Sequence, residues 1–202
     1  MTAFWDQRYA RADYLFGVAP NAFLARQAPR LKAGGRAIAI ADGEGRNGVW
    51  LAEQGLAVHA VDSSAVAQEK ARRLAAARGV ELELELVDLA TWSWPVAAYD
   101  VVVGIFIQFL PPDQRTAMFA HIAKALKPGG LLLLEGYRPK QVEYGTGGPS
   151  QPDNLYTEEL LRAAFADFTI VELTSYDAEI AEGSAHCGLS ALIDLVAVKP
   201  AT

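Results

Sequence analysis

The stretch AIAIADGEGRNGVWLA, which begins at Ala37, places a glycine-rich turn between an apolar run and a segment with helical character. Gly43, Gly45 and Gly48 follow the spacing G-x-G-x-x-G, and Gly55 ends the helix that is predicted to follow them. A strand, a glycine turn and a helix in this order form the first unit of a parallel sheet that carries helices on both faces. The turn therefore predicts an α/β fold with a Rossmann-like, doubly wound sheet.

Strands and helices continue to alternate through the first two thirds of the chain. Apolar runs predict four more strands, over residues 56–61, 81–87, 99–106 and 131–135. Ser63 or Ser64 is expected to cap the helix that ends at Gly79. Residues 81–87 alternate between glutamate and apolar side chains, which places this strand at the sheet edge with its glutamates in water. Residues 99–106 are apolar on both faces and are expected near the centre of the sheet.

The last third of the chain departs from this rhythm. Residues 141–154 form a polar loop rich in glycine and proline, and Thr157 is expected to cap a short helix after it. Two further strands are predicted over residues 168–176 and 189–198. The loop of about a dozen residues between them is short for a helical crossover, so these two strands should pair antiparallel.

The composition argues against several classes of partner and setting. A chain of 202 residues with 51% hydrophobic content is long enough for one domain with a full core, over residues 1–202. A net charge of −6 gives no attractive field for a phosphate backbone, so nucleic acid is not an expected partner. The longest apolar run, over residues 101–110, is about half of what a membrane helix needs, and no membrane partner is expected. Cys187 is alone and no leader opens the chain, which predicts a cytoplasmic protein.

A doubly wound sheet binds its ligand beyond the carboxyl ends of the strands, near the point where strand order reverses. The residues expected there follow the first four strands, and they are Ala41, Asp42, Gly43, Gly45, Asn47, Asp62, Ser63, Asp88, Leu89 and Ile105. The glycines let the backbone approach a ligand closely, and Asp62 is placed to accept hydrogen bonds from both hydroxyls of a ribose. These features suit NAD and S-adenosylmethionine (SAM) equally well.

Two features favour SAM over a dinucleotide. A nicotinamide cofactor usually occupies a second mononucleotide-binding half, whereas the C-terminal third of this chain predicts a loop and an antiparallel hairpin. Asp88 and Leu89 supply a carboxylate and a backbone amide for an adenine amino group, and Trp92 and Trp94 add aromatic surface. A plain turn-forming role for Asp88 is the competing interpretation. An NAD-dependent dehydrogenase is a distant alternative.

The chain resembles the class I SAM-dependent methyltransferases, and in particular a small bacterial branch related to the tellurite-resistance and thiopurine-type enzymes. Eight short segments carry this resemblance by their order and spacing, and they are Phe4–Tyr9, Gly17–Asn21, Gly43–Asn47, Val61–Ser63, Tyr99–Asp100, Leu126–Gly130, Tyr144–Pro149 and Glu182–Gly188. No single segment is decisive. Together they are specific for the fold and the cofactor and weak for the substrate.

The resemblance implies a seven-stranded sheet of order 3-2-1-4-5-7-6 with strand 7 antiparallel. It implies an enzyme that uses SAM, releases S-adenosylhomocysteine and methylates a small molecule, with a thiol or a metalloid oxyanion as the acceptor. Within the domain, residues 1–30 would form an aromatic flap and residues 137–156 a loop that acts as a lid. No metal is expected, and the oligomeric state is left open.

One position departs from the family pattern. The usual acid at the end of the first strand is absent, because alanine occupies both Ala39 and Ala41. Asp42 and Glu44 are the nearest carboxylates that could hold the ammonium group of SAM instead. The missing acid keeps open a second hypothesis, a SAM-binding sensor or partner subunit without turnover.

Methyl transfer depends on alignment and on exclusion of water more than on a strong base. Trp5 and Tyr9 have helical spacing and could cover the site, although plain packing of the helix would explain them equally well. The catalytic candidates are His186 and Tyr144, and His186 is favoured over the histidines at 59 and 121, which are expected to be structural. The candidates for substrate binding are Tyr14, Arg46 and Arg138, with surface ion pairing as the competing role of the two arginines.

Overall fold

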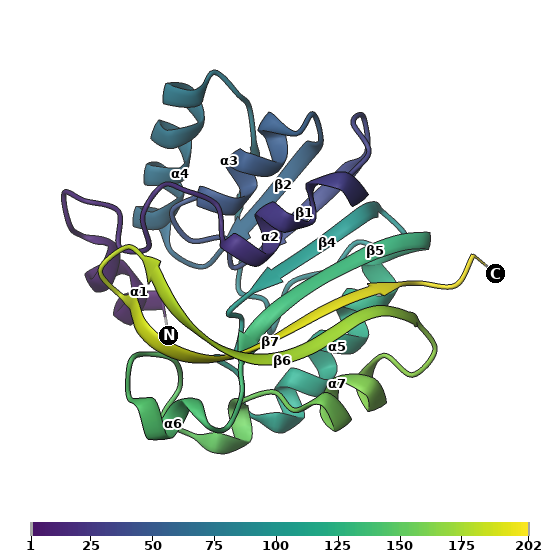
Figure 1. Ribbon diagram of the computed structural model, residues 1–202. Coiled ribbons are helices and arrows are strands. Elements are labelled where there is room, and N and C mark those ends of the chain that lie inside the picture. Colours follow the sequence, from purple (N-terminus) through teal and green to yellow (C-terminus); the bar gives the residue numbers. More distant parts are fainter. Residues whose placement is uncertain (1, 202) are drawn as a thin grey trace.

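A computed structural model describes residues 2–201 of the chain. Its seven strands form one sheet in the order β3-β2-β1-β4-β5-β7-β6, as the family resemblance implied (Figure 1). The strands are β1 (Arg36–Ile40), β2 (Ala57–Asp62), β3 (Glu83–Leu86), β4 (Tyr99–Ile105), β5 (Leu126–Tyr137), β6 (Thr169–Glu182) and β7 (His186–Val198). β7 runs antiparallel to both of its neighbours, and the pairs from β3 to β5 are parallel.

Helices cover both faces of this sheet. They are α1 (Thr2–Tyr9), α2 (Ala22–Arg26), α3 (Arg46–Glu53), α4 (Ala65–Arg78), α5 (Pro112–Ala125), α6 (Gln141–Tyr144) and α7 (Glu158–Ala164), with short 3-10 turns at Ala28–Arg30 and Pro152–Asn154. Successive side chains of a strand point to opposite faces. Ile38 and Ile40 therefore pack with the side of α5 and α7, while Ala37 and Ala39 pack with the side of α2 and α3.

Local sequence signals set the ends of the main helices. The Ser64 side chain accepts a hydrogen bond from the Ala67 amide and caps α4, which ends at Gly79 in the left-handed conformation. Thr157 caps α7 in the same way through the Leu160 amide. These three end signals confirm the predicted helix boundaries.

Strand β3 lies at the sheet edge, in agreement with its alternating sequence. Strand β4 is the central strand, in agreement with its apolar residues on both faces. β3 is shorter than predicted, because only residues 83–86 pair with β2. Residues 141–154 are not loop throughout, since they contain α6 and a 3-10 turn.

The predicted loop before the last strand is wrong. β6 and β7 keep pairing out to Glu182 and His186, so that only residues 183–185 connect them. His186 is therefore the first residue of β7 and does not lie in a loop. Alternation in the second half of β6, with Ala178 and Ile180 packed inward, explains why the hairpin extends this far.

The long hairpin reaches past the body of the sheet to the N-terminal segment (Figure 1). The amide of Ser184 in the hairpin turn donates to the Leu15 carbonyl at 3.0 Å. A Cβ atom at Gly183 would lie 2.4 Å from that carbonyl oxygen, so only glycine fits this contact. The hairpin tip and residues 15–17 thus form one side of the site described below.

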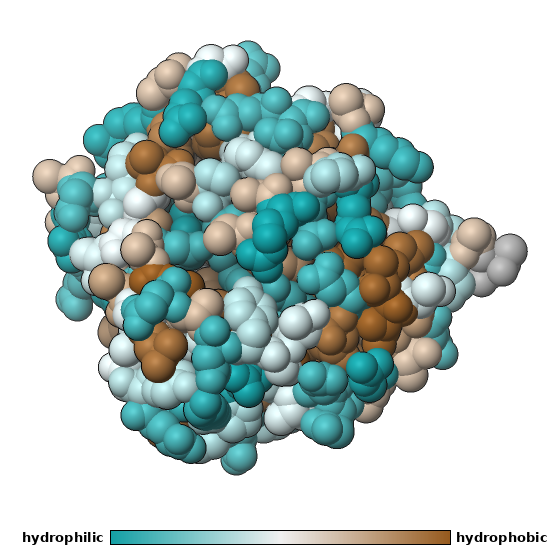
Figure 2. Space-filling view, viewed as in Figure 1, coloured by the Kyte–Doolittle hydropathy of each residue, from teal (hydrophilic) through white to brown (hydrophobic). Residues whose placement is uncertain are grey.

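The face of the molecule that carries α2 and the hairpin is largely hydrophilic, with a hydrophobic patch toward the side of the C-terminus (Figure 2). Among residues 2–201, no helix has both the length and the apolar character that crossing a membrane requires.

Candidate functional site

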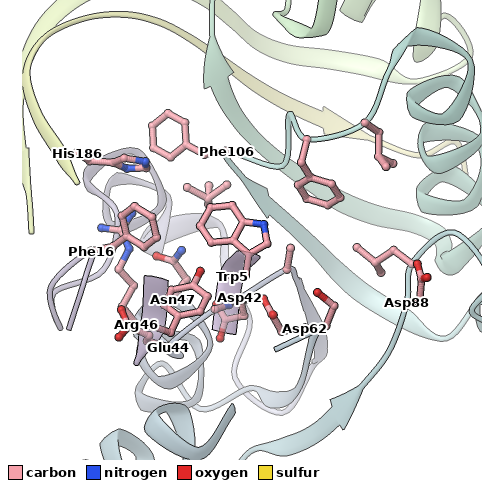
Figure 3. Close-up of a pocket in the computed structure, with 18 of the residues that line it drawn as sticks. Trp5, Phe16, Asp42, Glu44, Arg46, Asn47, Asp62, Asp88, Phe106 and His186 are labelled. Atoms are coloured by element: carbon pink, nitrogen blue, oxygen red, sulfur yellow. Dashed lines mark hydrogen bonds between the residues drawn. The ribbon is translucent and has the colours of Figure 1, made fainter. Parts of the chain in front are cut away.

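A cavity of about 360 Å³ opens at the carboxyl ends of β1, β2 and β4, where the strand order reverses. Figure 3 shows Asp62 and Asp88 toward one end of it and His186 toward the other, with Trp5 between them. The wall includes most of the residues that the sequence placed beside a nucleotide, namely Ala41, Asp42, Gly43, Asn47, Asp62, Ser63, Asp88, Leu89 and Ile105. Gly45 is the exception and does not line the cavity.

The turn after β1 has an unusual backbone. Ala41, Gly43 and Gly45 all have positive φ, at 49°, 60° and 89°. Gly45 is needed for packing, because a Cβ atom there would lie 2.6 Å from the Cβ atom of Ala71 on α4. Phe106, directly after β4, is also left-handed at φ 55°. Non-glycine residues in this conformation are uncommon and cluster at functional sites, which agrees with their place at the cavity.

Asp62 at the end of β2 holds the turn after β1 in place. One carboxylate oxygen accepts from the Gly43 amide at 2.9 Å and the other from the Ser64 amide at 2.8 Å. Burial raises the pKa of Asp62, and the backbone amides of Ser64 and Gly43 oppose that rise. An ionised carboxylate offers about four lone-pair sites, so both oxygens can still accept from a ligand.

Asp88 follows β3 and lies exposed at the cavity rim, where its carboxylate accepts from the Ala90 amide at 3.0 Å. Trp92 and Trp94, which the sequence placed beside the adenine, do not line the cavity. They pack against each other with ring centroids 5.0 Å apart, and Trp94 stacks on His121. These two tryptophans therefore belong to the core on the α5 side of the sheet.

Asp42 and Glu44, the two candidates for the missing acid, are held differently. Both Asp42 oxygens accept from the Gly48 amide, at 3.1 and 3.2 Å. Burial of this carboxyl raises its pKa to about 7, although the Gly48 hydrogen bond works in the opposite direction. Asp42 thus has no cationic side chain bonded to it and remains open to a positively charged group.

Glu44 does not point to solvent and is fully committed to neighbouring groups. Its carboxylate pairs with Lys70 of α4 at 2.6 Å and accepts from the Leu15 amide at 2.7 Å. Lys70 also donates to the Asp13 carbonyl at 2.7 Å. Both side chains of the pair are nearly inaccessible to solvent. Glu44 therefore fastens residues 13–15 to the turn after β1.

The N-terminal segment forms the aromatic side of the cavity. Trp5, Tyr9 and Phe16 all line it, and Trp5 stacks on Tyr9 with ring centroids 5.5 Å apart, as their helical spacing predicted. The Tyr9 hydroxyl lies against Gly43, where a Cβ atom would approach it to 2.8 Å. Glycine at position 43 therefore lets this segment close directly onto the turn.

His186 lies at the end of the cavity away from Asp62 (Figure 3). Its ring is 4.4 Å from that of Phe16 and 4.5 Å from that of Phe106, measured between centroids. The Nδ1 atom is buried without a hydrogen-bond partner, 3.9 Å from a carboxylate oxygen of Glu182. Burial lowers the pKa of His186, and the neighbouring Glu182 opposes this effect. The lowered pKa favours the neutral imidazole at pH 7.

Arg46, at the start of α3, lines the cavity but is not a free cation. Its guanidinium pairs with Glu182 at 2.7 Å, and both side chains are largely buried. Burial opposes ionisation of Glu182, but His186, Arg46 and the Ala22 amide together lower its pKa to about 2. Glu182 thus keeps its charge and holds Arg46.

The structure does not bring Tyr14, Tyr144 and Arg138 to the cavity. The Tyr14 hydroxyl donates to the Lys70 carbonyl at 3.1 Å. Tyr144 donates to Asp177 at 3.0 Å, and Arg138 contacts the same carboxylate and the Leu192 carbonyl. The two form a cluster on β6 outside the cavity, so their assigned roles have no structural support.

Several lining residues escaped the sequence interpretation. They are Gly17, Ala90, Phe109, Leu110 and Gln114. Phe106 was expected there, because it directly follows the carboxyl end of β4, and Phe109 lies only four residues beyond the same end. Gln114 lies in the first turn of α5, and nothing in its local sequence indicates that it faces a ligand.

Comparison with known proteins agrees with this geometry. Residues 37–130 match the family model described as a methyltransferase domain. Over 86 residues the chain is 35% identical to a carboxy-S-adenosyl-L-methionine synthase from Pseudomonas putida, a match that covers 40% of this chain and 35% of that protein. The chain thus spans about a third of the length of this curated relative.

Three solved structures share the fold over almost the whole chain at low sequence identity. The first comes from work on the conversion of a disulfide bond into a thioacetal group during echinomycin biosynthesis (TM-score 0.81, 18% identity, covering 100% of this chain and 93% of that one). The second is N-methyltransferase NodS from Bradyrhizobium japonicum in complex with S-adenosyl-L-homocysteine (TM-score 0.75, 16% identity, covering 98% of this chain and 98% of that one). The third is TehB from Haemophilus influenzae (TM-score 0.72, 14% identity, covering 98% of this chain and 66% of that one). Residues 37–130 are thus similar to a methyltransferase domain, and the whole chain shares its fold with these three structures.

Proposed function

We propose that this protein binds SAM in the cavity and transfers its methyl group to a small-molecule acceptor. The observation that carries the proposal is the convergence of the ends of β1, β2 and β4 on one cavity that has carboxylates at one end and an aromatic cover. The match to a methyltransferase domain and the S-adenosylhomocysteine bound by NodS support the same cofactor.

The residues present fit SAM. Asp62 would accept from the ribose hydroxyls, and Asp88 with the Leu89 backbone would hold the adenine amino group. Asp42, whose carboxylate has no cationic partner, would take the ammonium group in place of the acid that is absent at Ala39. Trp5 and Tyr9 would face the sulfonium, because aromatic faces attract cations.

Methyl transfer from a sulfonium is an in-line displacement, so the protein accelerates it mainly by aligning the two reactants and excluding water. The stacked pair Trp5 and Tyr9, with Phe16 beside it, is suited to that exclusion. A thiol or a metalloid oxyanion remains the proposed acceptor class, since soft nucleophiles of either kind need little activation. The sulfur chemistry associated with the echinomycin structure favours a sulfur acceptor.

A SAM-binding protein without turnover is the second candidate. The observation that favours it is the alanine at position 39, which lies buried in the core on the α2 side and offers no side chain to a ligand. A dehydrogenase is disfavoured, because the sheet after β5 ends in an antiparallel hairpin and offers no second nucleotide half.

Calorimetry and a turnover assay separate these functions. We expect SAM and S-adenosylhomocysteine to bind and to stabilise the protein by about 2.7 kcal/mol at a hundred times their Kd, while NADH has no effect. Release of S-adenosylhomocysteine with at least one thiol, selenite or tellurite would identify an enzyme. Tight SAM binding without release for any acceptor would favour the sensor, and stabilisation by NADH alone would refute both.

A further inference from the structure

The two ends of the cavity differ in charge. Asp62 and Asp88 lie toward one end and His186 toward the other (Figure 3). The carboxylate of Glu182 is 3.9 Å from His186, but Arg46 pairs with it at 2.7 Å and balances its charge. SAM has a sulfonium, an ammonium and a single carboxylate, so the bound cofactor would bring a net positive charge. An anion therefore meets less repulsion at the His186 end than at the Asp62 end.

Arg8 of α1 brings a further positive charge close to the His186 end. Its guanidinium carbon lies 5.2 Å from the ring centroid of Trp5, which lines the cavity, and 5.7 Å from that of Phe4. Burial lowers the pKa of His186 and raises that of Tyr9, and the charge of Arg8 adds to the first effect and opposes the second. His186 and Tyr9 both line the cavity, so the charge of Arg8 acts on its interior from the aromatic side.

Within residues 2–201 Arg8 has no acidic partner, unlike its neighbours. Arg11 and Arg46 each pair with a carboxylate, at 2.9 and 2.7 Å, whereas the exposed side chain of Arg8 forms no ion pair or hydrogen bond in this range. Cation–π attraction to the two rings holds the guanidinium in place and leaves its N–H donors open for a carboxylate, which arginine binds through two parallel hydrogen bonds. Since the chain carries a net charge of −6, such a local cation is needed to attract an anion.

The wall at the His186 end is aromatic. The rings of Phe16 and Phe106 flank the imidazole, with centroids 4.4 and 4.5 Å from it. A planar apolar group would bury its surface against these rings, and aromatic pairs gain additional energy from offset or edge-to-face contact. A bare oxyanion has no such surface and would lose its hydration there. This end therefore suits an acceptor with an apolar ring and one negative group.

We infer that the methyl acceptor is an aromatic or similarly apolar organic anion, whose ring packs against Phe16 and Phe106 and whose carboxylate pairs with Arg8. The nucleophilic atom belongs to the same molecule and is distinct from the group that Arg8 holds. Arg8 is thus the residue that selects a charged acceptor over a neutral one. The inference rests on the proposed function and specifies the substrate class of the same site.

A charged probe and a neutral probe of the same shape test Arg8 without turnover. In the complex with S-adenosylhomocysteine, we expect calorimetry to show that benzoate binds about threefold to tenfold more tightly than benzamide, as pairing with an exposed arginine allows. Arg8→Gln should abolish this preference, and Arg8→Lys should retain part of it. Arg11→Gln, in the same segment, is the matched control and should retain it fully. High salt should weaken the preference in the wild type.

Several results of this experiment would overturn the inference. They are equal binding of benzamide and benzoate by the wild type, binding of neither probe, and a preference that persists in Arg8→Gln. An equal loss of the preference in Arg8→Gln and Arg11→Gln would also overturn it, because the effect would then come from net charge and not from this site. Tighter binding of selenite than of benzoate would overturn the aromatic class. Failure to bind S-adenosylhomocysteine at all would instead refute the proposed function.

Two thiols that differ in one carboxylate separate charge selection from damage to the flap. Arg8→Gln should lower the ratio of kcat/KM for 2-mercaptobenzoate to kcat/KM for thiophenol by about threefold to tenfold, mainly through a higher KM for the charged thiol. Arg8→Lys should restore part of this ratio. An equal loss with both thiols would mean that Arg8 only packs against Trp5 and Phe4, and would overturn its role in selection.

Discussion

Asp62 is the residue on which both the turn geometry and the proposed cofactor site depend. Its carboxylate accepts from the amides of Gly43 and Ser64, and in the proposal it also accepts from the ribose. Loss of a charge-assisted hydrogen bond costs about 1.5–3 kcal/mol. We therefore expect Asp62→Ala to weaken SAM binding by roughly tenfold to a hundredfold in calorimetry. Asp62→Asn is the matched variant, because it removes the charge with little change in shape. An unchanged Kd in both variants would refute the assignment.

The raised pKa of Asp42 predicts that SAM affinity depends on pH. Its pKa of about 7 means that the carboxyl is mostly protonated at pH 5.5 and half ionised at pH 7. Since the ammonium group of SAM requires the ionised form, SAM should bind several-fold more tightly at pH 7 than at pH 5.5. Asp42→Asn should weaken binding at pH 7 and abolish this dependence. The groups that share the environment are Asp62 and Arg46, and retention of the full pH dependence in Asp42→Asn would assign it to one of them.

Residues 13–15 of the proposed flap are anchored to the turn after β1 by the buried pair of Glu44 and Lys70, so this pair gives a test of whether the flap limits access to the site. Glu44→Gln leaves an acceptor for the Leu15 amide but removes the charge that balances buried Lys70. Breaking a buried ion pair costs about 3–5 kcal/mol. We expect a lower melting temperature, faster amide exchange over residues 13–17, and SAM binding weakened about threefold to tenfold because the closed flap is less populated.

Two variants control this experiment. Glu69→Gln breaks an exposed pair with Arg72 on α4 and should change none of the three measurements. Glu44→Gln combined with Lys70→Met removes both charges and should recover part of the lost stability. Fast exchange over residues 13–17 in the wild type, equal to that of Glu44→Gln, would show that the pair does not hold the flap.

The elements show where sequence patterns are sufficient and where they are not. The full strand order came from the family resemblance. The edge position of β3, the antiparallel final pair and the caps at Ser64 and Thr157 follow from local alternation, a short connection and capping chemistry. The sequence predicted a β6–β7 hairpin that is too short, because Gly183 and Gly188 are typical of a loop. In the structure Gly188 pairs within β7, and only Gly183 lies in the connection between the two strands. The contact that fixes the hairpin tip joins Gly183 to Leu15, and no local pattern encodes such a distant pair.

In the candidate site, too, the sequence predicted the residues that the sheet topology places and did not predict those that distant side-chain contacts place. Of the ten residues predicted from the strand ends to bind a cofactor, nine line the cavity, because the topology of a doubly wound sheet fixes where its ligand lies. The substrate residues were harder to predict. Arg138 and Tyr144 lie near the right strands in sequence, but an ion-pair cluster around Asp177 holds them outside the cavity. The positions of Arg138 and Tyr144 depend on Asp177, which is distant in sequence, and spacing along the chain does not reveal such a partner.

A buried polar cluster links the centre of the sheet to the site. Glu135 on β5 and Asp194 on β7 are paired positions, and both are almost fully buried. The Tyr176 hydroxyl lies 3.4 Å from Glu135 and 3.3 Å from Asp194, and Asn21 bridges Glu135 to Glu182 beside the cavity. Burial raises the pKa of Asp194 to about 6, and burial together with Asp194 raises that of Glu135 well above its usual value.

These raised pKa values make the stability of the whole fold depend on pH. A carboxyl whose pKa is higher in the folded than in the unfolded protein stabilises the fold while it is protonated, and this contribution is lost as pH rises through the folded pKa. Between pH 5 and pH 8 the free energy of unfolding should therefore fall.

Glu135→Gln removes one of the two charges, so we expect it to raise the melting temperature at pH 8 by about 2–8 °C, equivalent to about 1–2 kcal/mol, and to change it little at pH 5. Glu179→Gln, at an exposed position on β6, should have no effect at either pH. Equal stabilisation by Glu135→Gln at pH 5 and pH 8 would show that the pair does not titrate in this range, and a wild-type stability that rises with pH would reverse the sign of the argument.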